Sequence, residues 1–152
     1  MDTASALAKL DAYYQAMPPV AAMHLRIAHY DAQHLRLHAP LAHHVNDKGC
    51  AFGGSLSSLM TLAAWGLVSM RLEAAGLPSD VYVADNRVRY LAPLYADLEA
   101  EAALSPEASW DEFIATLRSR GRARTHVDAW VRLPGGETAA EFSGRFVAFA
   151  KG

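Results

Sequence analysis

The chain lacks the features that mark several classes of protein. Its 152 residues contain one cysteine, Cys50, so no disulfide can form within the chain and a reducing compartment is expected. A formal net charge of −2 gives no reason to expect a nucleic acid as partner. The N-terminal segment has no signal-peptide pattern, and no apolar stretch is long enough to cross a membrane. We therefore expect a cytoplasmic protein with neither nucleic acid nor membrane as partner.

Internal repeats, low-complexity tracts and the spacings of metal ligands are also absent from the sequence, so no metal site is expected. Hydrophobic residues, in contrast, make up 52% of the chain, which is enough for a sizeable core. The length is typical of one domain. Residues 1–152 are therefore predicted to form a single domain.

A long helix is the main element that the hydrophobic pattern predicts. It covers Ser55–Ala75, has almost no polar face and is ended by Gly76-Leu77-Pro78. A helix that is apolar all round must be covered by other structure. In a chain of this length the cover has to be a sheet that curls around the helix, which predicts an α+β fold with a curved antiparallel sheet around a long central helix.

The strands for such a sheet are visible on both sides of the helix. A curled sheet keeps an open edge strand, which invites pairing with another copy of the chain, so a homodimer is expected. A further helix ends at Pro18-Pro19, and another opens with a capping box at Ser109. The predicted strands are Met23–His29, His34–Ala39, Asp80–Leu91, Asp97–Leu104, Arg122–Leu133 and Thr138–Ala150, and the two flanking helices are Thr3–Met17 and 109–119.

The segment Asn46–Ser55, which runs directly into the long helix, is the strongest candidate for a site. Its glycine pair, Gly53 and Gly54, lets a backbone or ligand approach closely. The first N–H groups of a helix are unpaired, and with the helix dipole they favour developing negative charge. The segment therefore predicts an oxyanion site built from backbone donors.

Polar side chains near the helix start allow two interpretations. Ser57, Ser58 and Thr61 share a helix face that Trp65 continues. These hydroxyls could hold a substrate or a water, or could bond to carbonyls one turn back. Asn46, likewise, could orient a substrate carbonyl or close its own turn.

Two neighbouring histidines and the cysteine complete the polar groups of this region. His43 and His44 could act as bases, because imidazole titrates near neutrality, but a place in a surface loop is the favoured interpretation. Cys50 is interpreted as a small buried residue. Farther along, Arg122 and Arg124 lie on one face of a predicted strand, where they could bind phosphate or form a solvated face.

The chain as a whole resembles the hotdog-fold thioesterase superfamily, and within it the C-terminal thioesterase domain of YiiD-type proteins. The matching motifs span nearly the whole chain in the right order, and the Phe-Gly-Gly-Ser run followed by Leu-Ala-Ala-Trp-Gly is the most specific of them. The residues that carry the resemblance are Met17–Pro19, Ala39–Leu41, Asn46–Ser55, Leu62–Gly66, Tyr90–Pro93, Gly121–Ala123 and Phe142–Phe146.

The resemblance implies a hotdog fold, a homodimer with active sites at the dimer interface, and hydrolysis of an acyl thioester. Whether such dimers pair into a tetramer stays open. Coenzyme A or the phosphopantetheine of an acyl carrier protein would enter as part of the substrate, with no separate cofactor. Two positions depart from the better-known members. Phe52 stands where a His is common, and Thr61 stands where an acidic base or nucleophile is usual. A threonine hydroxyl is a poor nucleophile without an adjacent base.

Two functions follow as hypotheses. In the first, the chain is a thioesterase with catalytic residues Asn46, Gly54 and Thr61. In the second, the same pocket binds an acyl-CoA or acyl carrier protein without cleaving it, as the missing carboxylate suggests. A dehydratase of the same fold ranks last, since it would need a His and an acid in the site. The residues expected to bind substrate are Phe52, Gly53, Ser55, Ser57, Ser58, Trp65, Arg122 and Arg124.

Overall fold

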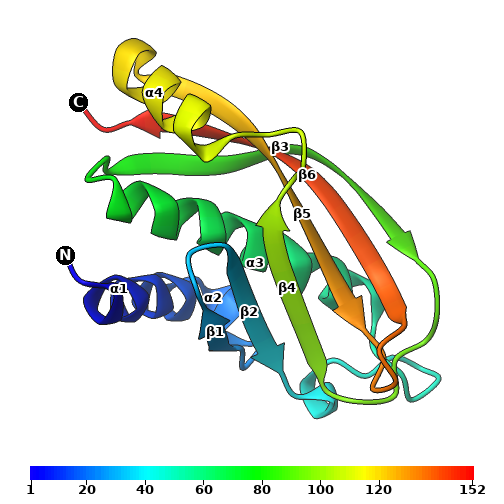
Figure 1. Ribbon diagram of the computed structural model, residues 1–152. Helices are drawn as coiled ribbons and strands as arrows, with labels where there is room; N and C mark the ends of the chain where they lie inside the picture. The colour runs from blue at the N-terminus through cyan, green and yellow to red at the C-terminus, as the bar shows by residue number, and fades with distance from the viewer.

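The long apolar helix lies at the centre of the protein. In the computed structural model, which describes all 152 residues, it is α3, Gly53–Ala74. Ten of its residues are buried, and they cover most of the helix circumference except the side that carries Ser58, Trp65 and Ser69. Figure 1 shows α3 running along the concave face of the sheet, as the sequence pattern predicts. None of the helices combines the length and the hydrophobicity that a membrane crossing requires.

One six-stranded antiparallel sheet wraps α3, in the order β1-β2-β4-β5-β6-β3. The α+β fold expected from the sequence is therefore confirmed. Chain order and sheet order differ at β3, which pairs only with β6 and forms an edge of the sheet. The strands are β1 Arg26–Tyr30, β2 His34–Ala39, β3 Ser79–Tyr90, β4 Leu98–Leu104, β5 Arg122–Arg132 and β6 Thr138–Ala150.

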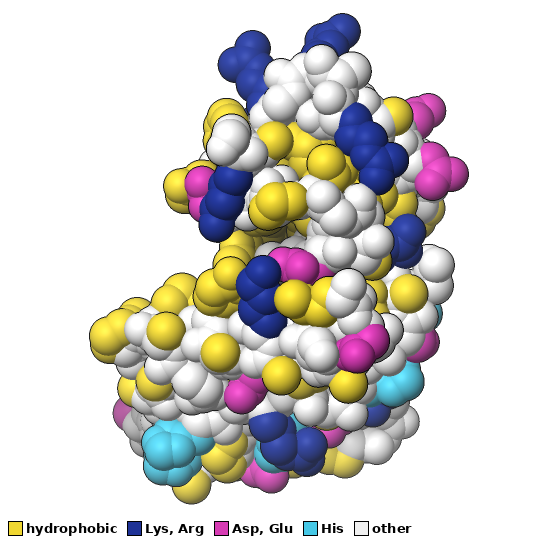
Figure 2. Space-filling view, turned by 90° about the vertical axis from the view of Figure 1, so that its left-hand side faces the viewer, with side chains coloured by type: hydrophobic (Ala, Val, Ile, Leu, Met, Phe, Trp, Pro, Cys, Tyr) yellow, Lys and Arg dark blue, Asp and Glu magenta, His cyan; other side chains and the backbone are white.

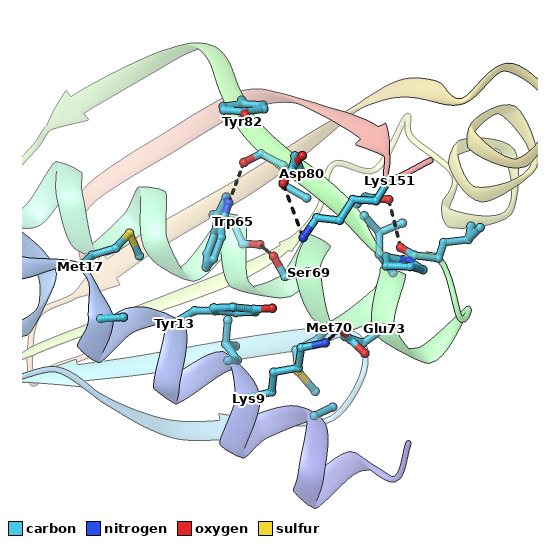
Figure 3. A pocket seen from close by; sticks show the side chains of 18 residues that line it. Lys9, Tyr13, Met17, Trp65, Ser69, Met70, Glu73, Asp80, Tyr82 and Lys151 are labelled. Carbon is cyan, nitrogen blue, oxygen red and sulfur yellow. Dashed lines mark hydrogen bonds and ion pairs between the residues drawn. The ribbon is translucent and has the colours of Figure 1, made fainter.

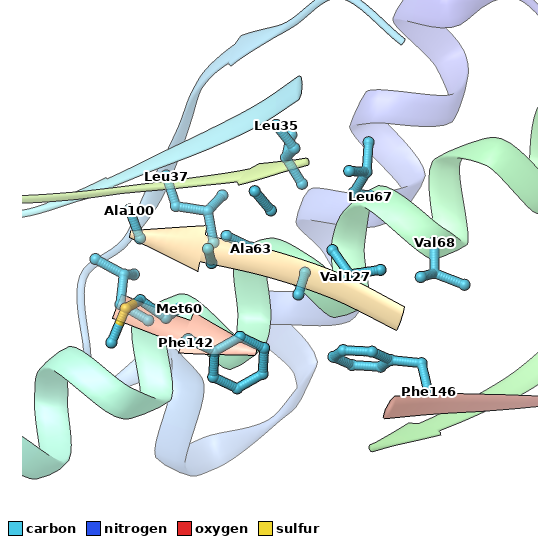
Figure 4. Packing of buried hydrophobic residues seen from close by; sticks show 14 of the residues in the cluster. Leu35, Leu37, Met60, Ala63, Leu67, Val68, Ala100, Val127, Phe142 and Phe146 are labelled. Carbon is cyan, nitrogen blue, oxygen red and sulfur yellow. The ribbon is translucent and has the colours of Figure 1, made fainter. Parts of the chain in front are cut away.

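The core lies between α3 and the concave face of the sheet. Along β5, residues alternate between exposed and buried, and the buried set, from Ala123 to Val131, faces the helix. Phe142 and Phe146 of β6 pack in the same core, as Figure 4 shows. One cluster of 35 buried residues results, and it leaves the sheet's other face to solvent.

Two flanking helices are predicted from the sequence, and the structure adds two short ones. Helix α1, Thr3–Ala16, ends before the two prolines as expected, but Pro18–Ala21 then forms a helix of its own, α2. Proline suits the first position of a helix, so the residues that stop α1 also start α2. The first strand consequently begins at Arg26 rather than at Met23. The second addition is a 3₁₀ turn, η1, at Leu41–His43.

The capping box opens α4, Trp110–Arg120, as predicted. The Ser109 hydroxyl accepts a hydrogen bond from the Glu112 N–H at 3.2 Å. The helix ends at Gly121, whose φ of +76° is a conformation that suits glycine. Buried Trp110, Phe113 and Leu117 join α4 to the common core.

Helix α1 packs directly against the middle of α3. The Tyr14 hydroxyl is buried there and donates a hydrogen bond to the Leu62 carbonyl at 2.7 Å. Burial raises the pKa of Tyr14 far above its usual value, so the hydroxyl stays protonated. The contact depends on Gly66, because a Cβ at that position would overlap the Tyr14 hydroxyl.

Candidate active site

The start of α3 presents two adjacent backbone donors. Phe52 is the N-cap residue, with an extended backbone (φ −65°, ψ 132°) and no side-chain cap. Its carbonyl accepts hydrogen bonds from the N–H groups of Ser55 and Leu56, at 3.0 and 3.1 Å. The N–H groups of Gly53 and Gly54 have no hydrogen-bond partner in the structure. They are therefore the two donors available to a developing oxyanion, while the Ser55 N–H is already engaged.

The two glycines are needed for different reasons. A Cβ on Gly54 would lie 2.5 Å from the Phe52 ring, so glycine allows that exposed ring to fold over the helix start. A Cβ on Gly53 would meet the Tyr90 ring at an ordinary 3.4 Å. The Tyr90 hydroxyl donates a hydrogen bond to the Gly53 carbonyl at 3.2 Å, which joins the end of β3 to the helix start.

Asn46 closes its own loop, which is one of the two roles open from the sequence. Its side-chain oxygen accepts hydrogen bonds from the N–H groups of Lys48 and Cys50, at 2.8 and 3.2 Å. Its side-chain amide donates to the buried Cys50 sulfur at 3.3 Å. Both polar ends of the amide are thus used in positioning the segment that leads to Phe52.

Two of the three helix hydroxyls bond to backbone carbonyls one turn back. Ser57 donates to the Gly54 carbonyl at 3.1 Å, and Thr61 donates to the Ser57 carbonyl at 2.8 Å. Ser57 thereby stays outside the mechanism proposed below. Ser58 is exposed. The Trp65 indole N–H donates to the Val81 carbonyl at 2.9 Å, which joins α3 to β3.

A pair that the sequence analysis did not recognise lies beside the glycines. The sequence favours a surface loop for His44, but only 5% of the residue is exposed. Its Nδ1 lies 2.8 Å from the Ser55 hydroxyl and its Nε2 lies 2.7 Å from the Met23 carbonyl. Local pattern does not predict these contacts, because Ser55 lies 11 residues and Met23 lies 21 residues away from His44, and the tertiary fold brings them together. His43, in contrast, is exposed as predicted.

The 3₁₀ turn that leads to His44 is anchored by Asp97. Its carboxylate accepts a hydrogen bond from the Leu41 N–H at 2.9 Å and contacts His38 Nε2 at 3.2 Å. The Leu41 N–H, and after it His38, hold the pKa of Asp97 below its usual 3.8. The anchor thus stabilises the fold above that pH.

Replacing Asp97 by asparagine tests this anchor through its pH dependence. The asparagine side chain would keep an acceptor for the Leu41 N–H but lose the charge. Because the folded-state pKa of Asp97 is lowered, its stabilisation is complete above 3.8 and is lost as pH falls through the lowered value. We expect D97N to lower the free energy of unfolding in urea at pH 7, and the difference from wild type to shrink well below pH 3.8. An equal difference at both pH values would contradict a charge-based anchor.

The two arginines proposed from the sequence lie away from the helix start. Arg122 and Arg124 are exposed on the outer face of β5, which is the face turned away from α3. Arg122 pairs with Phe149, and Phe149 pairs with Asp80 near the start of β3, whereas Gly53 lies beside Tyr90 at the end of β3. Within one protomer the sheet therefore separates these arginines from the glycine pair.

A groove of about 360 Å³ opens along the other half of α3. Figure 2 shows this face hollowed, with hydrophobic side chains inside and charged ones at the margin. Tyr13, Trp65 and Ser69 point into it in Figure 3. Its margin carries the ion pairs Lys9–Glu73, at 2.7 Å, and Lys151–Asp80, at 3.7 Å. Trp65 lies twelve residues beyond Gly53, or roughly 18 Å along the helix, so Phe52 and Trp65 do not share one pocket within a protomer.

The architecture is shared with solved structures of several bacterial proteins. A protein of unknown function from Chlorobaculum tepidum is 27% identical over 95% of this chain and 94% of its own, with a TM-score of 0.88. A putative thioesterase from Shewanella oneidensis is 25% identical over 97% and 99%, with a TM-score of 0.86. A thioesterase from Haemophilus influenzae, 14% identical over 93% and 90%, shares the fold with a TM-score of 0.71.

The sequence itself matches a family over almost its full length. The model of the family described as "Putative thioesterase (yiiD_Cterm)" matches residues 7–150. The matched range includes all six strands, the central helix and the glycine pair at its start. The chain therefore belongs to this thioesterase family and has the hotdog fold of its structural neighbours.

Proposed function

We propose that the protein hydrolyses an acyl thioester carried by coenzyme A or by the phosphopantetheine of an acyl carrier protein. The observation that carries the proposal is the pair of unpaired N–H groups, of Gly53 and Gly54, at the start of a buried helix in a chain of a thioesterase family. The thioester carbonyl would lie over this helix end. Its oxygen gains negative charge as the carbonyl carbon is attacked, which is the charge that such donors stabilise.

We also propose that a second copy of the chain completes the site by pairing along β3. The edge of β3 is twelve residues long, pairs on one side only, and exposes the large side chains of Tyr82, Val83 and Tyr90. Phe52, also exposed, precedes Gly53, whose carbonyl accepts the hydrogen bond of the Tyr90 hydroxyl at the end of β3. A long, exposed and apolar edge of this kind is a typical pairing surface.

Antiparallel pairing of two β3 strands would bring the two parts of the site together. The groove borders the start of β3, at Ser79–Tyr82, and the start of α3 borders its end, at Tyr90. In a two-fold antiparallel pair, the start of one strand lies opposite the end of the other. The groove of one copy would thus face the glycine pair of its partner and take the acyl chain, past Trp65. Arg122 and Arg124 keep their proposed role, binding the carrier's phosphates, only if the second copy brings substrate to the outer face.

The test is the release of free thiol from a panel of acyl-CoA and acyl carrier protein thioesters of increasing chain length. Release well above the buffer rate is expected. Because these carriers occur in the cytoplasm, we propose that compartment as the protein's location. Tight binding of a thioester that stays intact, with no release across the panel, would reject hydrolysis in favour of a non-catalytic binding module. A stable monomer in sedimentation at micromolar concentration would reject the two-copy site.

Variants of Ser69 test the groove in the same assay. Ser69→Phe fills the groove, so long acyl chains should lose roughly tenfold to hundredfold in kcat/KM, since each methylene left unburied costs about 0.8 kcal/mol. Short chains should lose little. Ser69→Ala removes the same hydroxyl without filling the groove and should keep the long-chain preference. An equal loss for all chain lengths would place the acyl chain elsewhere.

A further inference from the structure

The pair formed by His44 and Ser55 has the arrangement of an activated nucleophile. The Met23 carbonyl can only accept a hydrogen bond, so the His44 nitrogen 2.7 Å away, Nε2, must carry the proton. In the neutral ring, Nδ1 is then an acceptor, and the Ser55 hydroxyl at 2.8 Å donates to it. A hydroxyl that donates to an imidazole, whose other nitrogen is held by a third group, is the pattern of nucleophilic catalysis.

The backbone around Met23 holds that third group in place. His24 has a φ of +54°, a left-handed conformation that is uncommon outside glycine. Its ring stacks on the His43 ring, with 3.8 Å between centroids and 17° between planes. The stack connects the turn that carries the Met23 carbonyl to the residue preceding His44. Both ends of the His44 ring are therefore positioned by contacts outside its own loop.

The burial of His44 decides which group reaches the substrate. With 5% of the residue exposed and Nδ1 facing Ser55, the imidazole is shielded from bulk water and can exchange protons only with groups that lie at the Ser55 oxygen. Ser55 is half-buried and belongs to the first turn of α3, two residues after Gly53. Helix side chains tilt toward the N-terminus, so its hydroxyl projects toward the end at which the free N–H groups of Gly53 and Gly54 lie. Base, nucleophile and oxyanion donors thus meet at one helix end.

We propose that Ser55 is the catalytic nucleophile and His44 its base, an inference that rests on the proposed thioesterase function. The Ser55 oxygen attacks the thioester carbon while its proton passes to His44 Nδ1, and the oxyanion forms beside the Gly53 and Gly54 N–H groups. The carbon–sulfur bond breaks, and the leaving thiolate takes the proton from His44, which leaves an acyl ester on Ser55. A water then attacks this ester, gives a proton to His44, and Ser55 leaves with that proton as the carboxylic acid departs.

This dyad supplies the base that the sequence lacks at Thr61. Thr61 has no carboxylate, and its hydroxyl is already bonded to the Ser57 carbonyl. A positioned base typically contributes about 10²–10⁴-fold in rate. Loss of either member of the dyad should therefore lower kcat by about that factor. The two losses should not multiply in the double variant, because the residues act as one unit.

The experiment combines three variants with a search for the acyl-enzyme. Ser55→Ala removes the nucleophile. His44→Gln keeps an N–H that can donate to the Met23 carbonyl but has no base facing Ser55. Ser57→Ala is the matched control, since that hydroxyl bonds only to its own helix. Thiol release by each variant is measured with the best thioester of the panel. The acyl-enzyme is sought by intact mass and peptide mapping, once after the thioester reaction is quenched with acid and once after the protein has reacted with p-nitrophenyl acetate.

An acyl group mapped to Ser55 in the wild type, absent from Ser55→Ala, together with the large rate losses, is the expected result. Thioester cleavage at the wild-type rate by Ser55→Ala, or no acyl group on Ser55 with either reagent, would overturn the dyad and leave the thioesterase function standing. Acetylation of Ser55 by p-nitrophenyl acetate with no thioester cleaved would keep the dyad and reject the thioesterase function. If His44→Gln fails to fold, the Ser55 measurements decide alone.

Discussion

Gly53→Pro is expected to lower kcat for thioester hydrolysis by about 10²–10³-fold, the usual loss when one oxyanion donor is removed. Gly53 is the first residue of α3, and its N–H has no partner within the protein. Proline removes that N–H but suits the first helical position. The preceding residue, Phe52, already has the extended backbone (ψ 132°) that a following proline requires. The helix should therefore remain intact while one donor is lost.

Gly53→Ala is the matched control for this experiment. It keeps the N–H, and its Cβ would meet the Tyr90 ring at 3.4 Å, an ordinary contact distance. Its loss of kcat should be far smaller than that of the proline variant. Thermal unfolding should show that both variants fold. If Gly53→Pro keeps its kcat, or if both variants lose activity equally, the Gly53 N–H is not an oxyanion donor.

Gly66→Ala is expected to cause the largest loss of stability. The new Cβ would overlap the Tyr14 hydroxyl and lie 2.6 Å from Leu35, both of which are fully buried. Overpacking costs about 1–3 kcal/mol, and displacing Tyr14 from the Leu62 carbonyl costs about 1–3 kcal/mol more. The higher helix propensity of alanine offsets at most about 1 kcal/mol of this loss. We expect a net loss of about 1–6 kcal/mol in the free energy of unfolding, measured in urea.

A double-mutant cycle with Tyr14→Phe tests the cause of that loss. In the wild type, Tyr14→Phe removes one buried hydrogen bond to Leu62 and should cost about 1 kcal/mol. In the Gly66→Ala background it also removes the atom that the new Cβ overlaps, so it should cost less or even stabilise. If the loss in the double variant equals the sum of the two single losses, the helices adjust elsewhere and the Tyr14 contact is not the reason for glycine at position 66.

Local sequence pattern predicts the elements of the fold, but it predicts the contacts of the site residues only in part. The sequence predicts a helix start next to the glycine pair, because a turn followed by an apolar helix is encoded in consecutive residues. The helix begins at Gly53 rather than at the predicted Ser55, so both glycines belong to its first turn. The sequence leaves two interpretations of Asn46, and only the contacts with Lys48 and Cys50 show that it closes the loop. Thr61 and Ser57 are equally ambiguous until their carbonyl partners are known.

The sequence by itself determined that an apolar helix must be wrapped by an antiparallel sheet, because hydrophobic periodicity and turn residues act over short stretches of chain. It also determined that a helix follows the glycine-containing loop and that Ser109 caps α4, while the structure starts the long helix at Gly53, two residues before the predicted Ser55. Only the tertiary structure decided that His44 is buried between Met23 and Ser55, that β3 forms an open edge, and that Arg122 lies on the outer face at the opposite end from Gly53. These are contacts between residues far apart in the chain, and they depend on how the whole sheet closes on α3.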